Sequence, residues 1–413
     1  MQAEVDVAIA QAVSRQRLTT AYARTQRSVA AVASFLLGAM AVAATLLNSL
    51  YESFGPPRLG VVLVLLLTLH VLTSPRVLFT REFGLYALFL GYMWLSILWA
   101  PDAFLGLNTL LPGLNFLLLL VLFGSLVTFH EPKGVLLGML CGFACCACLY
   151  TLTQRFPLTR PVDFPYNAIA GMYLLGLFCV LAWGCYTRHG FVCLFIALVI
   201  MLHIVATTSI KANLGVLFGA IVAGVLYFRN FAGVLRNYAI ALIIVSAGIA
   251  YGIMSNDALL ERVESGYMRV SLGVEILSAR EDTPKGTSIA ERQDWKHIGL
   301  VGWAENPIFG RGVEAFRADH GITSHSTPID LLYNFGLIGL VLFYAVFATL
   351  VGRLYRIRGM QAGQLPILVI AGLTCYAFIT LSGTMHYNSF LAVFIGTSAA
   401  LLRRHSLPAQ SAP

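Results

Sequence analysis

Charged residues are scarce in this chain. Asp, Glu, Lys and Arg make up 11% of its 413 residues, where soluble proteins carry about a quarter. Hydrophobic residues make up 58%, and the mean hydropathy is +0.79. This composition excludes a soluble globular protein and indicates an integral membrane protein. The formal net charge of +8 does not indicate nucleic-acid binding, because the basic residues are spread over many short segments.

Cysteine is absent from the one long polar segment, residues 255–327, so no disulfide can staple it. All eight cysteines fall within apolar runs, and four of them lie between Cys141 and Cys148. A thiolate in hydrocarbon is costly, and structural metal sites use spaced thiolates together with His or further Cys. Packing of small buried side chains is therefore the better interpretation of the cysteines.

Twelve apolar runs are long enough to form membrane-spanning helices, since each needs about 20 residues to cross ~30 Å of hydrocarbon. We expect an all-α polytopic membrane protein of about twelve transmembrane helices with one large polar loop, and the sequence shows no internal repeat. The runs lie near residues 29–50, 59–75, 83–100, 104–128, 135–153, 167–187, 190–208, 212–228, 236–254, 328–350, 366–384 and 388–402.

The basic residues predict the orientation, because cytoplasmic loops retain Lys and Arg. With the N-terminus inside, only Arg58, Arg155, Arg160 and Lys211 fall on the exported side, apart from those in the long loop. The predicted order is a cytoplasmic segment at 1–28, nine helices within 29–254, an exported loop at 255–327, three helices within 328–402 and a cytoplasmic tail at 403–413. The loop carries 8 basic and 11 acidic residues, a net charge of −3, so an anion site in it must be local.

Ionisable residues lie at the predicted outer ends of the helices rather than at their middles. Lys211 begins the eighth apolar run, Asp330 begins the tenth, and His203 lies one to two turns below the outer end of the seventh. Transporters usually keep ionisable or discontinuous segments near the bilayer midplane. The distribution favours a site at the outer membrane surface over a transport path.

A helix is predicted inside the loop. Ser288 and Glu291 form a capping box, and Asn306-Pro307 should end the helix. Arg292 shares one helical stripe with Trp295, and two interpretations of that position stay open. The arginine either lies along apolar surface beside the tryptophan or faces the membrane domain to hold an anion.

A longer pattern connects this helix to the next apolar run. It contains Arg292 with Trp295, then Asn306-Pro307, Gly310-x-Gly312 and Phe316, and finally His325-Ser-x-x-x-Asp330-Leu-Leu-x-x-x-Gly336-Leu-Ile-Gly339. This pattern, the helix count and the single exported loop resemble the O-antigen ligase and polymerase superfamily of bacterial inner membranes. Family members also carry an arginine near the start of a central helix, and Ser209-Ile210-Lys211 is similar in position, with Lys in place of Arg.

The resemblance implies glycosyl transfer from an undecaprenyl-diphosphate-linked glycan at the periplasmic face of the inner membrane, in a GT-C-like helical fold without a metal or other cofactor. Such a reaction needs cations to meet the charge on the departing diphosphate, and arginine binds phosphate oxygens in a bidentate manner. It also needs a base for the acceptor hydroxyl, and a histidine titrates near neutrality. Direct attack in a single displacement should invert the anomeric centre.

On this resemblance, His325 is the expected catalytic base, with Arg292 beside it in the catalytic site. The residues expected to bind the diphosphate are Lys211, Arg155, Arg160 and Arg292, although Arg155 and Arg160 could equally contact lipid headgroups. A second tier comprises the cations Arg269, Arg280 and Arg311, the fallback base His320, and Asp330, which would orient the ring of His325. From the residues alone, each histidine is better interpreted as a surface or hydrogen-bonded residue.

Within the family we favour a ligase that joins the glycan to a sugar hydroxyl of lipid A-core. An O-antigen polymerase and a protein O-oligosaccharyltransferase stay open, because they share the loop pattern. A transporter or flippase of lipid-linked glycans is the alternative from another class of protein. The absence of midplane charges and of inverted repeats from the sequence argues against it.

Overall fold

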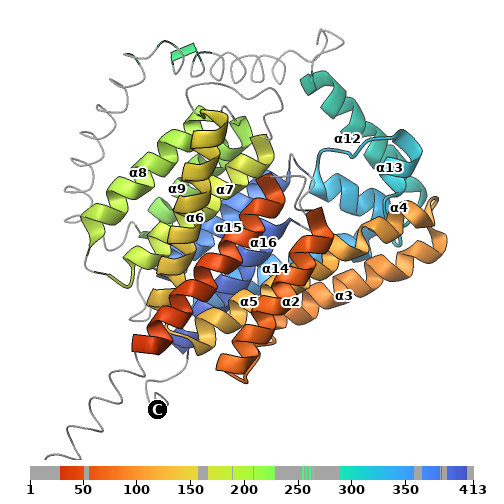
Figure 1. Cartoon of the computed structure of the whole chain (residues 1–413). Coiled ribbons are helices and arrows are strands. Elements are labelled where there is room, and N and C mark those ends of the chain that lie inside the picture. Colours follow the sequence, from red (N-terminus) through yellow and green to blue (C-terminus); the bar gives the residue numbers. More distant parts are fainter. Residues whose placement is uncertain are drawn as a thin grey trace, which may run out of the picture.

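The chain folds into a helical bundle, seen in a computed structural model (Figure 1). The structure describes residues 28–50, 55–156, 166–187, 189–207, 209–227, 254, 257, 260–261, 264, 288–357, 365–381, 383 and 388–406, and within them all regular structure is helical. The helices are Ser28–Leu50, α2 (Gly55–Thr73), α3 (Arg81–Leu95), η1 (Ser96–Trp99), α4 (Ala103–Asn108), α5 (Leu110–Phe129), α6 (Pro132–Gln154), α7 (Tyr166–Gly184), α8 (Gly190–Ala206), α9 (Ile210–Tyr227), α12 (Ser288–Glu305), α13 (Ala315–His320), α14 (Thr327–Ile357), α15 (Leu365–Thr380) and α16 (Ser389–Ser406).

Eleven of the twelve predicted apolar runs coincide with helices, and the run at 236–254 lies outside the described residues except for Met254. Among the described helices, six are long and apolar enough to cross a membrane, and four apolar helices are shorter. These helices make the chain a polytopic membrane protein, whereas the count of twelve spans stays a prediction. The helices α14 and α16 extend beyond the apolar runs that predicted them, to Ile357 and Ser406.

Glycines spaced four residues apart in α6 and α9 allow neighbouring helices to approach closely. A Cβ atom at Gly138 or Gly142 of α6 would overlap the backbone of the helix Ser28–Leu50. Gly215 and Gly219 of α9 lie similarly against α15, where a Cβ would press on Cys375 and on the carbonyl of Ala371. In Figure 1, α9 and α15 lie side by side, consistent with their extensive contacts.

Polar contacts between helices fix one end of the bundle. Nδ1 of His70 lies 2.9 Å from Nε2 of His130, and Arg404 donates a hydrogen bond to the carbonyl of His130. Arg353 of α14 forms an ion pair of 2.7 Å with the fully buried Glu82 of α3. All these residues lie at the helix ends assigned to the cytoplasmic side by the basic residues.

At the other end, α14 is broken at Gly336, which has φ 61° and ψ −161°. Backbone dihedrals in that region are accessible almost exclusively to glycine. The break leaves the backbone groups on either side of it to find partners outside the helix. The turn after α12 supplies them: Arg311 and Gly312 donate to the carbonyls of Tyr333 and Asn334, and Leu337 donates to the carbonyl of Pro307.

The two glycines of the Gly310-x-Gly312 pattern allow the turn after α12 to pack against the break in α14. Both glycines have positive φ, 70° and 99°. A Cβ at Gly310 would overlap the backbone of Asn334 and Phe335, so close approach as well as conformation requires glycine there. Asn334 also accepts a hydrogen bond of 2.8 Å from the amide of Phe316. The turn that follows α12 is therefore fixed to the membrane domain just beyond the predicted histidine.

Candidate active site

His325 lies in a short connection between α13 and α14, and the backbone around it is held tightly. It adopts a left-handed conformation, with φ 56°, which a non-glycine residue adopts rarely. The neighbouring Ser324 and Ser326 are buried, and the hydroxyl of Ser324 donates to the carbonyl of Ser326. The backbone amide and hydroxyl of Thr327 both donate to the carbonyl of Gly383, in the α15–α16 connection. These contacts fix the direction in which the imidazole leaves the chain.

Asp330 contributes to this rigidity. Its buried carboxylate accepts a hydrogen bond of 3.2 Å from the amide of Ser324, and its own amide donates to the carbonyl of Ser326. The carboxylate therefore binds the backbone immediately before His325. Its predicted role as the partner of the imidazole ring stays a prediction.

Two predicted cations lie near His325, although they come from elements far apart in the sequence. Lys211 lies in the first turn of α9, and Arg292 lies in the second turn of α12. Partial burial lowers the pKa of His325 below its ordinary value, and the positive charges of Arg292 and then of Lys211 lower it further. The imidazole is therefore held in its neutral form, which can accept a proton.

A third cation, Lys296, joins this cluster and was not predicted. It lies four residues after Arg292 on the same face of α12, and both positive charges act on Lys211. The helical spacing from Arg292 was a signal in the sequence that could have identified it. Three positive charges and a neutral histidine thus converge from α9, α12 and the connection before α14. We name Lys211, Arg292, Lys296 and His325 the cationic cluster.

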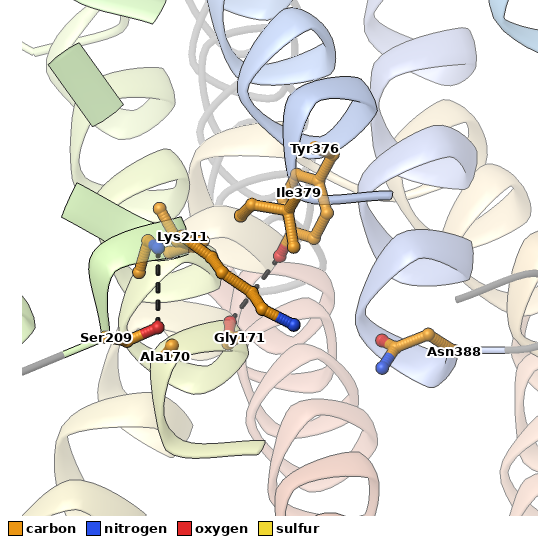
Figure 2. Close-up of a pocket in the computed structure, with 9 residues that line it drawn as sticks. Ala170, Gly171, Ser209, Lys211, Tyr376, Ile379 and Asn388 are labelled. Atoms are coloured by element: carbon orange, nitrogen blue, oxygen red, sulfur yellow. Dashed lines mark hydrogen bonds between the residues drawn. The ribbon is translucent and has the colours of Figure 1, made fainter. Parts of the chain in front are cut away.

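Lys211 extends into a small pocket between α7, α9, α15 and the start of α16 (Figure 2). Ser209, Tyr376 and Asn388 contribute polar atoms to its lining. The hydroxyl of Ser209 accepts a hydrogen bond from the amide of Ala212 in the first turn of α9, and Tyr376 donates to the carbonyl of Gly171 at 3.5 Å. Figure 2 shows the ammonium of Lys211 directed across the pocket toward Asn388.

A larger, apolar cavity of about 300 Å³ lies next to this pocket. Leu174 and Tyr376 line both, so the two spaces are neighbours. The cavity is bounded by α7, α9, α15 and α16, with Phe178, Val216 and Phe394 among its lining residues. The pocket at Lys211 has a volume of only about 10 Å³, so it can admit one oxygen of an anionic group rather than a whole head group. The adjoining apolar cavity is large enough for part of a hydrocarbon tail.

The same region of the chain matches a known protein family. Residues 192–344 match the O-antigen ligase (Wzy_C) family. These residues belong to that family. Its members are glycosyltransferase-type enzymes that act on lipid-linked glycans in ligase- or polymerase-type transfer. No curated protein matches the chain.

The family segment extends from α8 into α14 and includes the whole cationic cluster. Two of the second-tier residues in this segment, Arg311 and His320, belong to a separate cluster. Arg311 pairs with Glu305 at 2.6 Å and with Asp319 at 3.4 Å, and its guanidinium lies over the ring of Tyr333. His320 packs between the rings of Phe316, Trp295 and Tyr333. We name Arg311, Asp319, His320 and Tyr333 the aromatic cluster.

The remaining predicted cations lie outside the family segment or outside the described residues. Arg155 follows the last residue of α6, is exposed, and adopts a left-handed conformation with φ 52°. Arg160, Arg269 and Arg280 lie outside the described residues. Their roles in binding the diphosphate stay predictions.

Proposed function

We propose that this protein transfers a glycan from undecaprenyl diphosphate to a sugar hydroxyl of lipid A-core, at the periplasmic face of the inner membrane. The convergence of a neutral histidine with Lys211 and Arg292, beside an apolar cavity, carries the proposal. The hydrocarbon tail of the donor would occupy the apolar side, and the diphosphate would face the cations.

In the proposed reaction, Nε2 or Nδ1 of His325 accepts the proton of the acceptor hydroxyl. The hydroxyl oxygen then forms a bond to the anomeric carbon as the bond from that carbon to the diphosphate oxygen breaks. The electron pair of the broken bond leaves with the diphosphate, whose growing negative charge is stabilised by Lys211 and Arg292. Attack and departure occur on opposite faces of the sugar, so the anomeric centre is inverted. The proposed step needs no metal, because these residues supply the base and the cations.

The proposed orientation has both termini in the cytoplasm and the cationic cluster outside. The basic residues support it through the excess of Lys and Arg on the cytoplasmic side. The predicted outer helix ends carry Lys211 and Asp330, whereas His130, Arg353 and Arg404 lie at the opposite ends.

Deletion of the gene distinguishes a ligase from the related polymerase and protein O-oligosaccharyltransferase. A ligase mutant should show lipopolysaccharide with bare core and an accumulation of lipid-linked polymer. Core that carries a single repeat unit would instead identify a polymerase, and unchanged lipopolysaccharide with loss of a glycosylated protein would identify a protein O-oligosaccharyltransferase. Purified protein in detergent should form product from lipid-linked glycan and acceptor, whereas a flippase would need a sealed compartment.

A further inference from the structure

Asn388 lines the same pocket as Lys211, and the site described so far gives it no role. It is the residue immediately before α16, where its side-chain Oδ1 accepts a hydrogen bond of 2.9 Å from the amide of Phe390. Its carbonyl accepts another of 3.2 Å from the amide of Ala392. Asn388 is thus the N-cap of α16.

The cap determines which way the side-chain amide faces. A backbone N–H can only donate, so the amide oxygen of Asn388 must point toward Phe390. The Nδ2 group then turns away from the helix, and Figure 2 shows the side chain at the edge of the pocket toward which Lys211 extends. The ammonium of Lys211 and the Nδ2 group of Asn388 can only donate hydrogen bonds to a ligand in the pocket.

The segment that carries Asn388 is also connected to the catalytic histidine of the proposed mechanism. Gly383 in this α15–α16 connection accepts both hydrogen bonds of Thr327, two residues after His325. Gly383 thus contacts the backbone beside His325, and Asn388, five residues later, lines the pocket of Lys211.

We propose that Asn388 binds the diphosphate of the lipid-linked donor, donating a hydrogen bond from Nδ2 to a phosphate oxygen next to the one held by Lys211. The inference rests on the proposed function and adds a donor from α16 to those from α9 and α12. A ligand group that accepts from an ammonium and a neutral amide together, beside further positive charge, is an anion with several oxygens. The diphosphate is the part of the donor with that chemistry.

Two substitutions separate this role from capping, because serine and aspartate are N-cap residues as good as asparagine. Asn388→Ser keeps an acceptor for Phe390 and removes the amide donor. Binding of undecaprenyl diphosphate, which lacks the glycan and cannot react, should weaken about tenfold or more. Asn388→Asp keeps the cap and brings a negative charge to the phosphates, so its binding loss should be larger. The KM for the donor should rise in parallel, with a smaller change in kcat.

Asn108→Asp is the matched control, because it adds the same charge at an exposed residue at the end of α4. The thermal unfolding of all three full-length variants in detergent should match that of the unsubstituted protein. Unchanged undecaprenyl diphosphate affinity in both Asn388 variants would overturn the inference and reduce Asn388 to a cap. If the unsubstituted protein itself neither binds this lipid nor transfers the glycan, the proposed function fails instead.

Discussion

The region from α12 to α14 contributes to two clusters that each contain an arginine and a histidine but differ in charge balance. In the aromatic cluster, Arg311 is paired with Glu305 and Asp319, and the hydroxyl of Tyr333 donates to Asp319 at 2.6 Å. In the cationic cluster, Arg292 and Lys296 face Lys211 and His325. Among the ion pairs between described residues, none includes Lys211, Arg292 or Lys296.

This difference separates a structural role from a binding role. Arg311 and its partners satisfy one another and hold the turn against α14, so the aromatic cluster needs no ligand. Like charges held together without an acid cost free energy, and functional sites are where proteins tolerate that cost. The cationic cluster is therefore suited to an external anion.

The largest expected difference is in glycan transfer, between the variants of His325 and of His320. His325→Ala should lower transfer by about 100- to 10,000-fold, because it removes the base that accepts the proton of the acceptor hydroxyl. His320→Ala removes a ring that packs against Phe316 and Trp295, so it should lower the thermal unfolding temperature and leave transfer largely intact. Product formation from lipid-linked glycan, with membrane expression as the control, measures both. Near-normal product from His325→Ala would remove this residue from the mechanism.

Substitutions of Arg292 and Arg311 should also differ, with donor binding affected at Arg292 and stability at Arg311. The expected factor is smaller than for the histidines. Arg292→Ala should weaken donor binding by about 10- to 100-fold, the loss of a charge-assisted contact with phosphate. Arg292→Lys should recover only part of that affinity, because lysine lacks the planar fork. Arg311→Ala should instead reduce stability, since it breaks pairs with Glu305 and Asp319. Equal donor affinity in Arg292→Ala and the unsubstituted protein would assign Arg292 a structural role.

Much of this arrangement could be predicted from local sequence. The Asn306-Pro307 stop predicted the end of α12, which runs from Ser288 to Glu305, whereas the capping box of Ser288 and Glu291 stays a prediction. The apolar runs gave most helices, because membrane helices are marked by their own composition. The roles expected for His325 and Arg292 came from the family resemblance, and the structure brings these residues together with Lys211.

What could not be predicted depends on contacts between distant residues. The glycines at 310 and 312 were part of a pattern, but their purpose appears only when the turn docks on the break at Gly336. Asn388 looked like an ordinary residue before an apolar run, and its place beside Lys211 comes from packing of α16 near α7 and α9. Asp330 could reach either the ring or the backbone near His325, and the left-handed turn at His325 presents the amide of Ser324 to it.

The smallest expected effect is a shift in pH dependence, and it tests whether the cations act on His325. The protonated imidazole cannot serve as a base, so kcat/KM should fall as the pH drops through the pKa of His325. Because burial, Arg292 and Lys211 lower that pKa, the fall should occur below about pH 6.5, the ordinary value for histidine. Arg292→Gln removes one positive charge, which favours the protonated ring and should move the fall to higher pH. A bound diphosphate offsets the same cations, so the corresponding fall in kcat should lie at higher pH than that in kcat/KM. An acidic limb that stays in place in Arg292→Gln would mean that this charge does not reach the imidazole.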